Sequence, residues 1–211
     1  MKKKIINMLE LQDSMNRKVN ADWRNAGFEW YRAIWMESAE MLDHYGWKWW
    51  KKQEADVMQV KLEVVDIVHF GLSIRLVQGA SQDSTIEQIA EAIAIDFEHP
   101  RTTADVRTNI ELLASATLLD QGAHFSIIAG IMDHLDMAFD ELYEVYVGKN
   151  ILNIFRQDNG YKDGSYQKVW GGREDNEHLA DVLTRLDCNK ASFKDDIYQA
   201  LTEIYCSQCA A

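Results

Sequence analysis

The amino-acid sequence predicts an all-α protein with one domain. Apolar residues recur with a helical period along most of the chain, and strict alternation of apolar and polar residues nowhere extends beyond about four residues. Only one proline occurs in 211 residues, so little interrupts long helices. Hydrophobic residues make up 47% of the composition, which is enough for one sizeable core. Because no repeat or linker divides the chain, we expect a single helical bundle over residues 1–211.

The expected helices are separated by recognisable breaks. They cover residues 5–18, 28–46, 55–78, 84–97, 104–120, 124–147 and 193–208, with a shorter helix near 175–186. The breaks contain residues that typically end helices, namely Gly27, Gly46, Gly79, Pro100 and Gly122. Ser84 and Glu87 have the spacing of a capping box, so the fourth helix is expected to begin there.

Residues 148–172 differ from the rest of the chain in composition. They contain five glycines together with lysine, arginine and aromatic residues, and few acidic ones. This composition predicts a long, basic, Gly-rich loop. Long loops within a compact domain are usually functional or disordered, so we interpret this segment as a candidate part of a binding site.

The charge of the chain excludes several classes of partner. Its net charge is −12 and its pI is near 4.9, so its electrostatic field would repel a nucleic acid polymer. An odd number of cysteines, three, favours a reducing compartment, and we expect a cytoplasmic protein. The lysine-rich start is not followed by the apolar stretch of a secretory leader. The most apolar run, residues 62–77, contains too many polar residues to span a membrane.

Two pairs of carboxylates have a spacing that places both members on one helix face. Glu37 and Glu40 are three residues apart in the second expected helix, and Glu63 and Asp66 repeat this spacing in the third. The third helix is apolar almost all round, so it is expected to be buried. Buried carboxylates need a cation or hydrogen bonds to offset their desolvation and mutual repulsion.

Four carboxylates on two adjacent core helices predict a site for Mg²⁺, with Mn²⁺ as a substitute, because hard cations prefer oxygen ligands. An iron site is disfavoured, since neither pair has the Glu-x-x-His spacing of di-iron bundles. The spacing alone leaves open that Glu37 and Glu40 are ordinary surface acids.

These two motifs, ExxE at residues 37–40 and ExxD at residues 63–66, resemble the metal-binding signature of the all-α nucleoside triphosphate pyrophosphohydrolase superfamily. More specifically, the chain resembles the dimeric dUTPase family. The similar segments are LQDSMN at 11–16, WMESAEMLD at 35–43 with WKWWK at 47–51, and GKNILNIFRQDNGYK at 148–162, which continues to residue 176. The resemblance covers roughly residues 9–76 and 143–183, and no motif is recognised in residues 77–142 or beyond residue 184.

The resemblance implies a homodimeric enzyme that hydrolyses dUTP to dUMP and pyrophosphate, limiting uracil in DNA and supplying dUMP for dTMP synthesis. By the same resemblance, Glu37, Glu40, Glu63 and Asp66 would bind Mg²⁺, and Glu40 would orient and deprotonate the attacking water. Phosphate contacts are implied for Lys149, Arg156, Tyr161 and Lys168. Base or nucleoside contacts are expected for Gln12, Asn16, Trp47, Trp49, Phe70 and Asn153.

Other interpretations of these residues stay open. Gln12 and Asn16 could form a solvent-facing stripe, and Trp47 and Trp49 could belong to the core or to a dimer interface. His69 is interpreted as a hydrogen-bonded core residue that binds no metal. The substrate could instead be dCTP or a noncanonical triphosphate, and the chain could be a silent nucleotide-binding module. Whether dUDP is also hydrolysed is left open.

Overall fold

The computed structural model describes residues 1–209, which form nine helices and one short hairpin. The helices are α1 (Lys2–Val19), α2 (Trp30–Tyr45), α3 (Val57–Ser81), α4 (Ile86–Glu98), α5 (Val106–Asp120), α6 (Phe125–His134), α7 (Phe139–Asp158), α8 (Asp175–Leu183) and α9 (Phe193–Cys209). Strands β1 (Val169–Trp170) and β2 (Arg173–Glu174) pair antiparallel in the hairpin. The predicted all-α class is confirmed.

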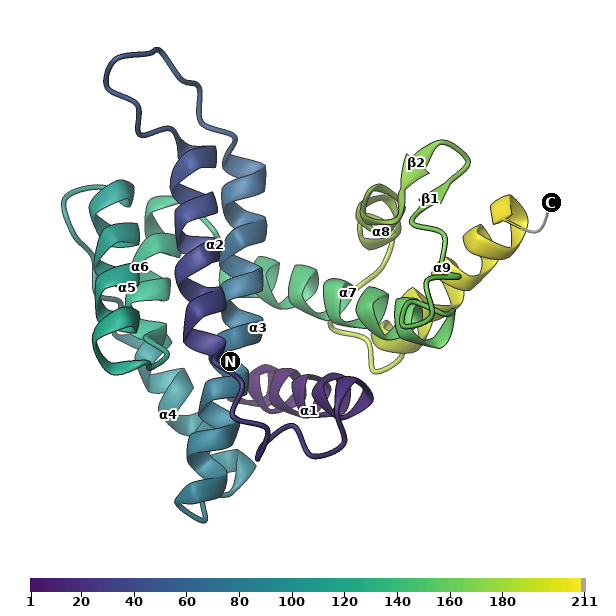
Figure 1. Cartoon of the computed structure of the whole chain (residues 1–211), viewed down its shortest axis with the longest axis horizontal. Helices are drawn as coiled ribbons and strands as arrows, with labels where there is room; N and C mark the ends of the chain where they lie inside the picture. The colour runs from purple at the N-terminus through teal and green to yellow at the C-terminus, as the bar shows by residue number, and fades with distance from the viewer. Residues whose placement is uncertain (210–211) are drawn as a thin grey trace.

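Helices α2 to α6 form one group, and α7 leads from this group to the C-terminal elements (Figure 1). The antiparallel pair of α2 and α3 shares the most extensive helix contact of the fold. Helix α1 runs parallel to α7. Two ion pairs show this direction, since Lys4 pairs with Asp140 near the start of both helices and Lys18 pairs with Asp158 near their ends. The hairpin, α8 and α9 surround the far end of α7 (Figure 1).

Helix α3 lies at the centre of the helical group. Its side chains are apolar on almost every face, and Val64, Val65, Ile67 and Val68 are fully buried. A helix of this kind has no solvent face to orient it, so it must be covered by neighbours all round. Helices α1, α2, α4, α6 and α7 all pack against it. The few polar side chains of α3 are therefore held in defined positions inside the protein.

The single helix expected over residues 124–147 is wrong, because the structure has two helices there. Between α6 and α7 the backbone of Asp136 adopts a left-handed conformation with φ of 49°. The Met137 amide then donates to the Met132 carbonyl oxygen at 3.0 Å, a hydrogen bond typical of a helix C-terminus. Aspartate tolerates this conformation better than most residues, but neither glycine nor proline marks the turn in the sequence.

The loop expected over residues 148–172 is also wrong in its first part. Helix α7 continues to Asp158, because Ile151, Leu152 and Phe155 recur at helical spacing and are buried. The actual connection covers residues 159–172 and ends in the hairpin. There Gly171 and Gly172 have positive φ values of 54° and 84°, as a two-residue hairpin turn requires.

At α4 the capping box is shifted by one residue from the expected pair and joins Thr85 to Gln88.

Within residues 1–209, no helix is both long enough and apolar enough to cross a membrane.

Helix α8 is fixed to α7 by a buried ion pair. The Arg156 guanidinium on α7 donates to both carboxylate oxygens of Asp175, each at 2.8 Å. The Tyr166 hydroxyl donates to the same carboxylate at 2.8 Å, and the Asp175 side chain is fully buried. Burial alone would raise the pKa of Asp175, but the bonds from Arg156 and Tyr166 outweigh it, so this pKa is lowered.

We predict that Asp175→Asn lowers the free energy of unfolding by about 3–5 kcal/mol, because it leaves the buried Arg156 charge without a carboxylate. Since the native pKa of Asp175 is lowered, its contribution is complete above the ordinary carboxyl pKa and is lost as pH falls through the lowered value. Urea denaturation at several pH values measures both effects. Asp181→Asn is the matched control, because its pair with Arg173 is exposed, and it should cost little. Equal losses in the two variants would contradict the assignment.

Candidate active site

Three carboxylates meet between α2 and α3. Glu37 comes from α2, and Glu63 and Asp66 come from the facing side of α3. One oxygen of each lies within 4.8 Å of the others. Opposite oxygen ligands of one octahedral Mg²⁺ are about 4.2 Å apart, twice the metal–oxygen distance. The donor set therefore suits a hard divalent cation.

The electrostatics of this cluster are unfavourable without a cation. Burial, a hydrogen bond with Glu63 and the charge of Asp66 together raise the pKa of Glu37 to about 8. Burial is also the main cause that raises the pKa of Glu63. Desolvated carboxylates at this spacing resist full ionisation. The packing of α2 against α3 thus holds negative charge where a cation would stabilise it.

Glu40 lies one helical turn beyond Glu37 on α2, and its side chain is exposed. It is not among the three carboxylates that approach within 4.8 Å. Its charge nevertheless raises the pKa of both Glu37 and Glu63, so it lies on the same side of the helix pair. It is more exposed to solvent than the partly buried Glu37 and Asp66 and the buried Glu63.

Two cationic or basic side chains border the carboxylates. The Lys149 ammonium on α7 forms an ion pair with Asp66. His44 Nε2 lies 3.5 Å from Glu63 Oε1. Lys149 was expected to bind phosphate, and the structure places it next to the cluster, where its phosphate role stays a prediction. His44 was missed, although its position four residues after Glu40 put it on the same helix face.

Gln12 and Asn16 are buried, with 5% and 6% of their surface exposed, so the interpretation as a solvent-facing stripe is wrong. Their amides belong to a polar network whose directions can be deduced. Ser73 Oγ donates to the His69 backbone oxygen at 3.1 Å, so it must accept the bond from Asn16 Nδ2 at 2.9 Å. Asn16 Oδ1 therefore faces Gln12 and accepts from Gln12 Nε2 at 3.0 Å.

This orientation decides the protonation of His69. Gln12 Oε1 lies 2.9 Å from His69 Nδ1 and accepts from the Tyr146 hydroxyl at 2.8 Å. Because Gln12 Oε1 can only accept, His69 Nδ1 carries the proton. Burial, with the charge of Lys149, lowers the pKa of His69 to about 3, so the ring is neutral at pH 7. The expected hydrogen-bonded core position of His69 is confirmed.

Two polar groups next to this network have buried atoms without a hydrogen-bond partner among the described residues. They are His69 Nε2, which is an acceptor in this tautomer, and the side-chain amide of Asn150 on α7. The Asn150 amide also lies close enough to Tyr146 to lower the pKa of its hydroxyl, against the larger raising effect of burial. Unpaired buried polar groups are costly, and they commonly mark a place that a ligand or water fills. Tyr146 and Asn150 were missed, since nothing local in the sequence distinguishes them from core positions.

The aromatic residues expected around the base have different environments. Phe70 on α3 is half-buried, and its ring centroid lies 6.2 Å from that of Trp30. Trp47 and Trp49 lie in the connection between α2 and α3, where they are 44% and 90% exposed. The alternative that they belong to the core is therefore wrong. Their contact with a base or with a second protomer stays a prediction.

The structure does not bring the remaining expected phosphate ligands to the carboxylates. Arg156 lies on α7 and is bound to Asp175, and it also donates to Asn153 Oδ1 at 3.0 Å. Tyr161 is exposed in the connection after α7. Lys168 pairs with Glu174 of the hairpin at 3.3 Å. Within residues 1–209, none of these three side chains contacts the carboxylate cluster through an ion pair or a hydrogen bond. Their contacts with phosphate stay predictions.

Comparison with known proteins identifies the family. A family model described as dUTPase matches residues 4–161. The match includes residues 77–142, where no motif was recognised, and it ends before the hairpin. No curated protein matches the chain. The matched range contains the carboxylate cluster, the Gln12 network and Lys149. The chain belongs to the all-α dUTPase family and hydrolyses dUTP.

Proposed function

We propose that the chain is a Mg²⁺-dependent dUTP pyrophosphatase that releases dUMP and pyrophosphate in the cytoplasm. In the cell, this reaction would limit uracil incorporation into DNA and supply dUMP for dTMP synthesis. The observation that carries the proposal is the approach of Glu37, Glu63 and Asp66 to within 4.8 Å at the interface of α2 and α3. Membership of the dUTPase family supports the substrate.

We assign the metal ligands to Glu37, Glu63 and Asp66, with Glu40 completing the set from the exposed side of the helix pair. The carboxylate donors fit Mg²⁺, and Mn²⁺ can use the same oxygen ligands. Bound Mg²⁺ would neutralise charge on the phosphate oxygens and hold the triphosphate in place. Such positioning and charge stabilisation account for most of the catalysis of phosphoryl transfer.

The side chains around the metal ligands have separate tasks in this proposal. Glu40 orients the attacking water and accepts its proton, which its exposed position allows. Lys149 lies against Asp66 and offers its ammonium group to a phosphate oxygen. Arg156, Tyr161 and Lys168 would reach phosphate only after rearrangement, because two of them are engaged in ion pairs.

The buried amide network supports recognition of uracil. Gln12 Nε2 and Asn16 Nδ2 each use one hydrogen within the described network and keep a second donor. His69 Nε2 offers an acceptor. Two donors and one acceptor complement the uracil edge, which has two carbonyl oxygens flanking one N–H. Cytosine presents an amino group and an unprotonated nitrogen on this edge, so it would leave the network mismatched. Phe70, one turn after Asp66, would stack on the ring, and Asn153 would contact the sugar.

We predict that dUTP alone is hydrolysed rapidly within a panel of dUTP, dCTP, dTTP, dATP, dGTP and UTP, and that EDTA stops the reaction. Pyrophosphate release measures turnover, and added Mg²⁺ should restore it. Preferential turnover of dCTP would leave the metal site standing and refute the uracil assignment of Gln12, Asn16 and His69. Full activity in EDTA would refute the metal dependence, and no turnover of any nucleotide would favour the silent binding module.

We predict that Glu63→Gln, Asp66→Asn and Glu40→Gln each lower turnover at least about a hundredfold, because each removes a charge that acts in the transition state. In EDTA, Glu63→Gln and Glu40→Gln should unfold at or above the wild-type urea midpoint, since like-charge repulsion is relieved, whereas Asp66→Asn also loses its ion pair with Lys149 and is judged by activity alone. Loss of activity without loss of stability distinguishes a functional carboxylate from a structural one. Glu98→Gln on α4, an exposed carboxylate of the same type, is the control and should change neither property. Near wild-type turnover in the three variants would disprove the site.

We also propose a homodimer, supported by the exposed aromatic side chains of Trp35, Trp49 and Trp50. We predict a mass of twice 24.3 kDa by light scattering. A mass of 24.3 kDa at all micromolar concentrations would contradict this prediction.

A further inference from the structure

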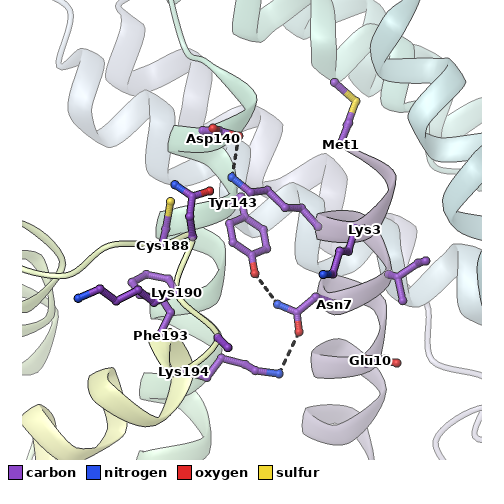
Figure 2. Close-up of a pocket in the computed structure, with 14 residues that line it drawn as sticks. Met1, Lys3, Asn7, Glu10, Asp140, Tyr143, Cys188, Lys190, Phe193 and Lys194 are labelled. Carbon is purple, nitrogen blue, oxygen red and sulfur yellow. Dashed lines mark hydrogen bonds and ion pairs between the residues drawn. The ribbon is translucent and has the colours of Figure 1, made fainter.

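A cavity of about 730 Å³ lies apart from the carboxylate cluster. It is enclosed by the first turns of α1, the first turns of α7 and the segment 188–194 that leads into α9 (Figure 2). None of the expected site residues lines it. Its volume is that of a pocket for a small organic molecule, about 300–1,000 Å³.

The cavity is positively charged although the whole chain carries a net charge of −12. Four lysines line it, and they are Lys3, Lys4, Lys190 and Lys194. The lining carboxylates are Glu10 and Asp140, and Asp140 is paired with Lys4 at 2.9 Å. In the described part of the chain, none of the other three lysines has a carboxylate within ion-pair distance. Among the lining side chains, three lysines and one carboxylate are therefore left without an ion pair, and this local excess of positive charge favours an anion.

Part of this charge is held in place by partly buried hydrogen bonds that involve Asn7, Tyr143 and Lys194. Asn7 Nδ2 donates to the Tyr143 hydroxyl at 2.5 Å, and Asn7 Oδ1 accepts from the Lys194 ammonium at 2.9 Å (Figure 2). Tyr143 is only 7% exposed, so this series of hydrogen bonds begins at a core residue. The Lys4 ammonium lies 5.0 Å from the centre of the Tyr143 ring. Two of the four lysines are thus oriented by the fold, unlike mobile lysines on an open surface.

We propose that this cavity binds an organic polyphosphate of nucleotide size. Lysine ammonium groups pair with phosphate oxygens as point charges, and several of them favour a multiply charged ligand. Ile6 and Phe193 supply apolar wall for the organic part. The segment 188–194 lies outside the range that matches the dUTPase family, whereas most of the wall from α1 and α7 lies inside it. The cavity is separate from the catalytic carboxylates, which lie between α2 and α3.

Cys188 provides a direct probe, because this half-buried thiol lines the cavity while the exposed Cys206 does not. The full chain is alkylated with iodoacetamide in EDTA, which keeps metal-dependent binding at the carboxylates out of the measurement. Inorganic triphosphate and dTTP are the two ligands, and mass spectrometry follows each cysteine. At ten times the half-protecting concentration, dTTP should slow Cys188 labelling about tenfold and leave Cys206 unchanged.

The paired substitution Lys3→Gln and Lys190→Gln should raise the half-protecting concentration about tenfold, which corresponds to about 1.4 kcal/mol. Neither side chain forms an ion pair in the described structure, so folding should be retained, as circular dichroism can verify. Lys51→Gln with Lys52→Gln, in the connection between α2 and α3, removes the same charge elsewhere and should have no effect.

Protection by dTTP at lower concentration than by inorganic triphosphate supports the proposal. Equal protection by both ligands overturns the proposal that the ligand is organic, because the charge of the phosphates alone then explains binding. Absence of protection, or protection unchanged in the Lys3 and Lys190 variant, overturns the site. The labelling measurement does not involve hydrolysis of dUTP. Neither result therefore supports or contradicts the proposed function.

Discussion

The contact of three carboxylates between α2 and α3 is the constraint on which the rest of the structure depends. Repulsion among Glu37, Glu63 and Asp66 opposes the packing of these two helices. The packing succeeds because α3 buries Val64, Val65, Ile67 and Val68 completely. Each such side chain contributes about 1.5–3 kcal/mol when it leaves water, so the four together exceed the cost of about 3 kcal/mol for keeping a proton on one carboxylate at neutral pH. The core of this protein thus holds together a carboxylate cluster that its own electrostatics oppose.

Helix α7 connects this site to the rest of the molecule. Tyr146, Lys149, Asn153 and Arg156 follow one another at intervals of three or four residues, so they lie along one face. Along this face α7 contacts, in turn, the Gln12 network, the Asp66 carboxylate and the buried Asp175 of α8. One helix thus fixes the relative positions of the buried amide network, the carboxylate cluster and the C-terminal elements.

The parts of this arrangement that depend on local periodicity could be predicted from the sequence. The burial of α3 and the facing positions of Glu37 and Glu63 follow from apolar spacing, and the structure has both. The polar network could not be predicted, because its bonds join residues that are distant in the sequence, such as Asn16 and Ser73 or Gln12 and Tyr146. The amides of Gln12 and Asn16 were identified as a pair, but their burial depends on these distant partners.

The errors have physical reasons of the same kind. The break between α6 and α7 rests on a left-handed aspartate, Asp136, where the sequence has no glycine or proline. The basic composition of residues 148–172 suggested a loop, but the buried Ile151, Leu152 and Phe155 extend the helix through its first part. The ion pair of Arg156 with the buried Asp175 could not be anticipated, because only the tertiary structure brings the two residues together, and the phosphate contact of Arg156 stays a prediction.

The continuity of α7 has a consequence for how chains of this kind can diverge. Inserting one residue after Lys149 would rotate everything beyond it by about 100° around the helix axis. Lys149 would keep its place at Asp66, whereas Arg156 would turn away from Asp175 and release α8. Insertions and deletions should therefore accumulate in the connections at residues 46–56 and 159–168, while the length between Tyr146 and Arg156 remains fixed.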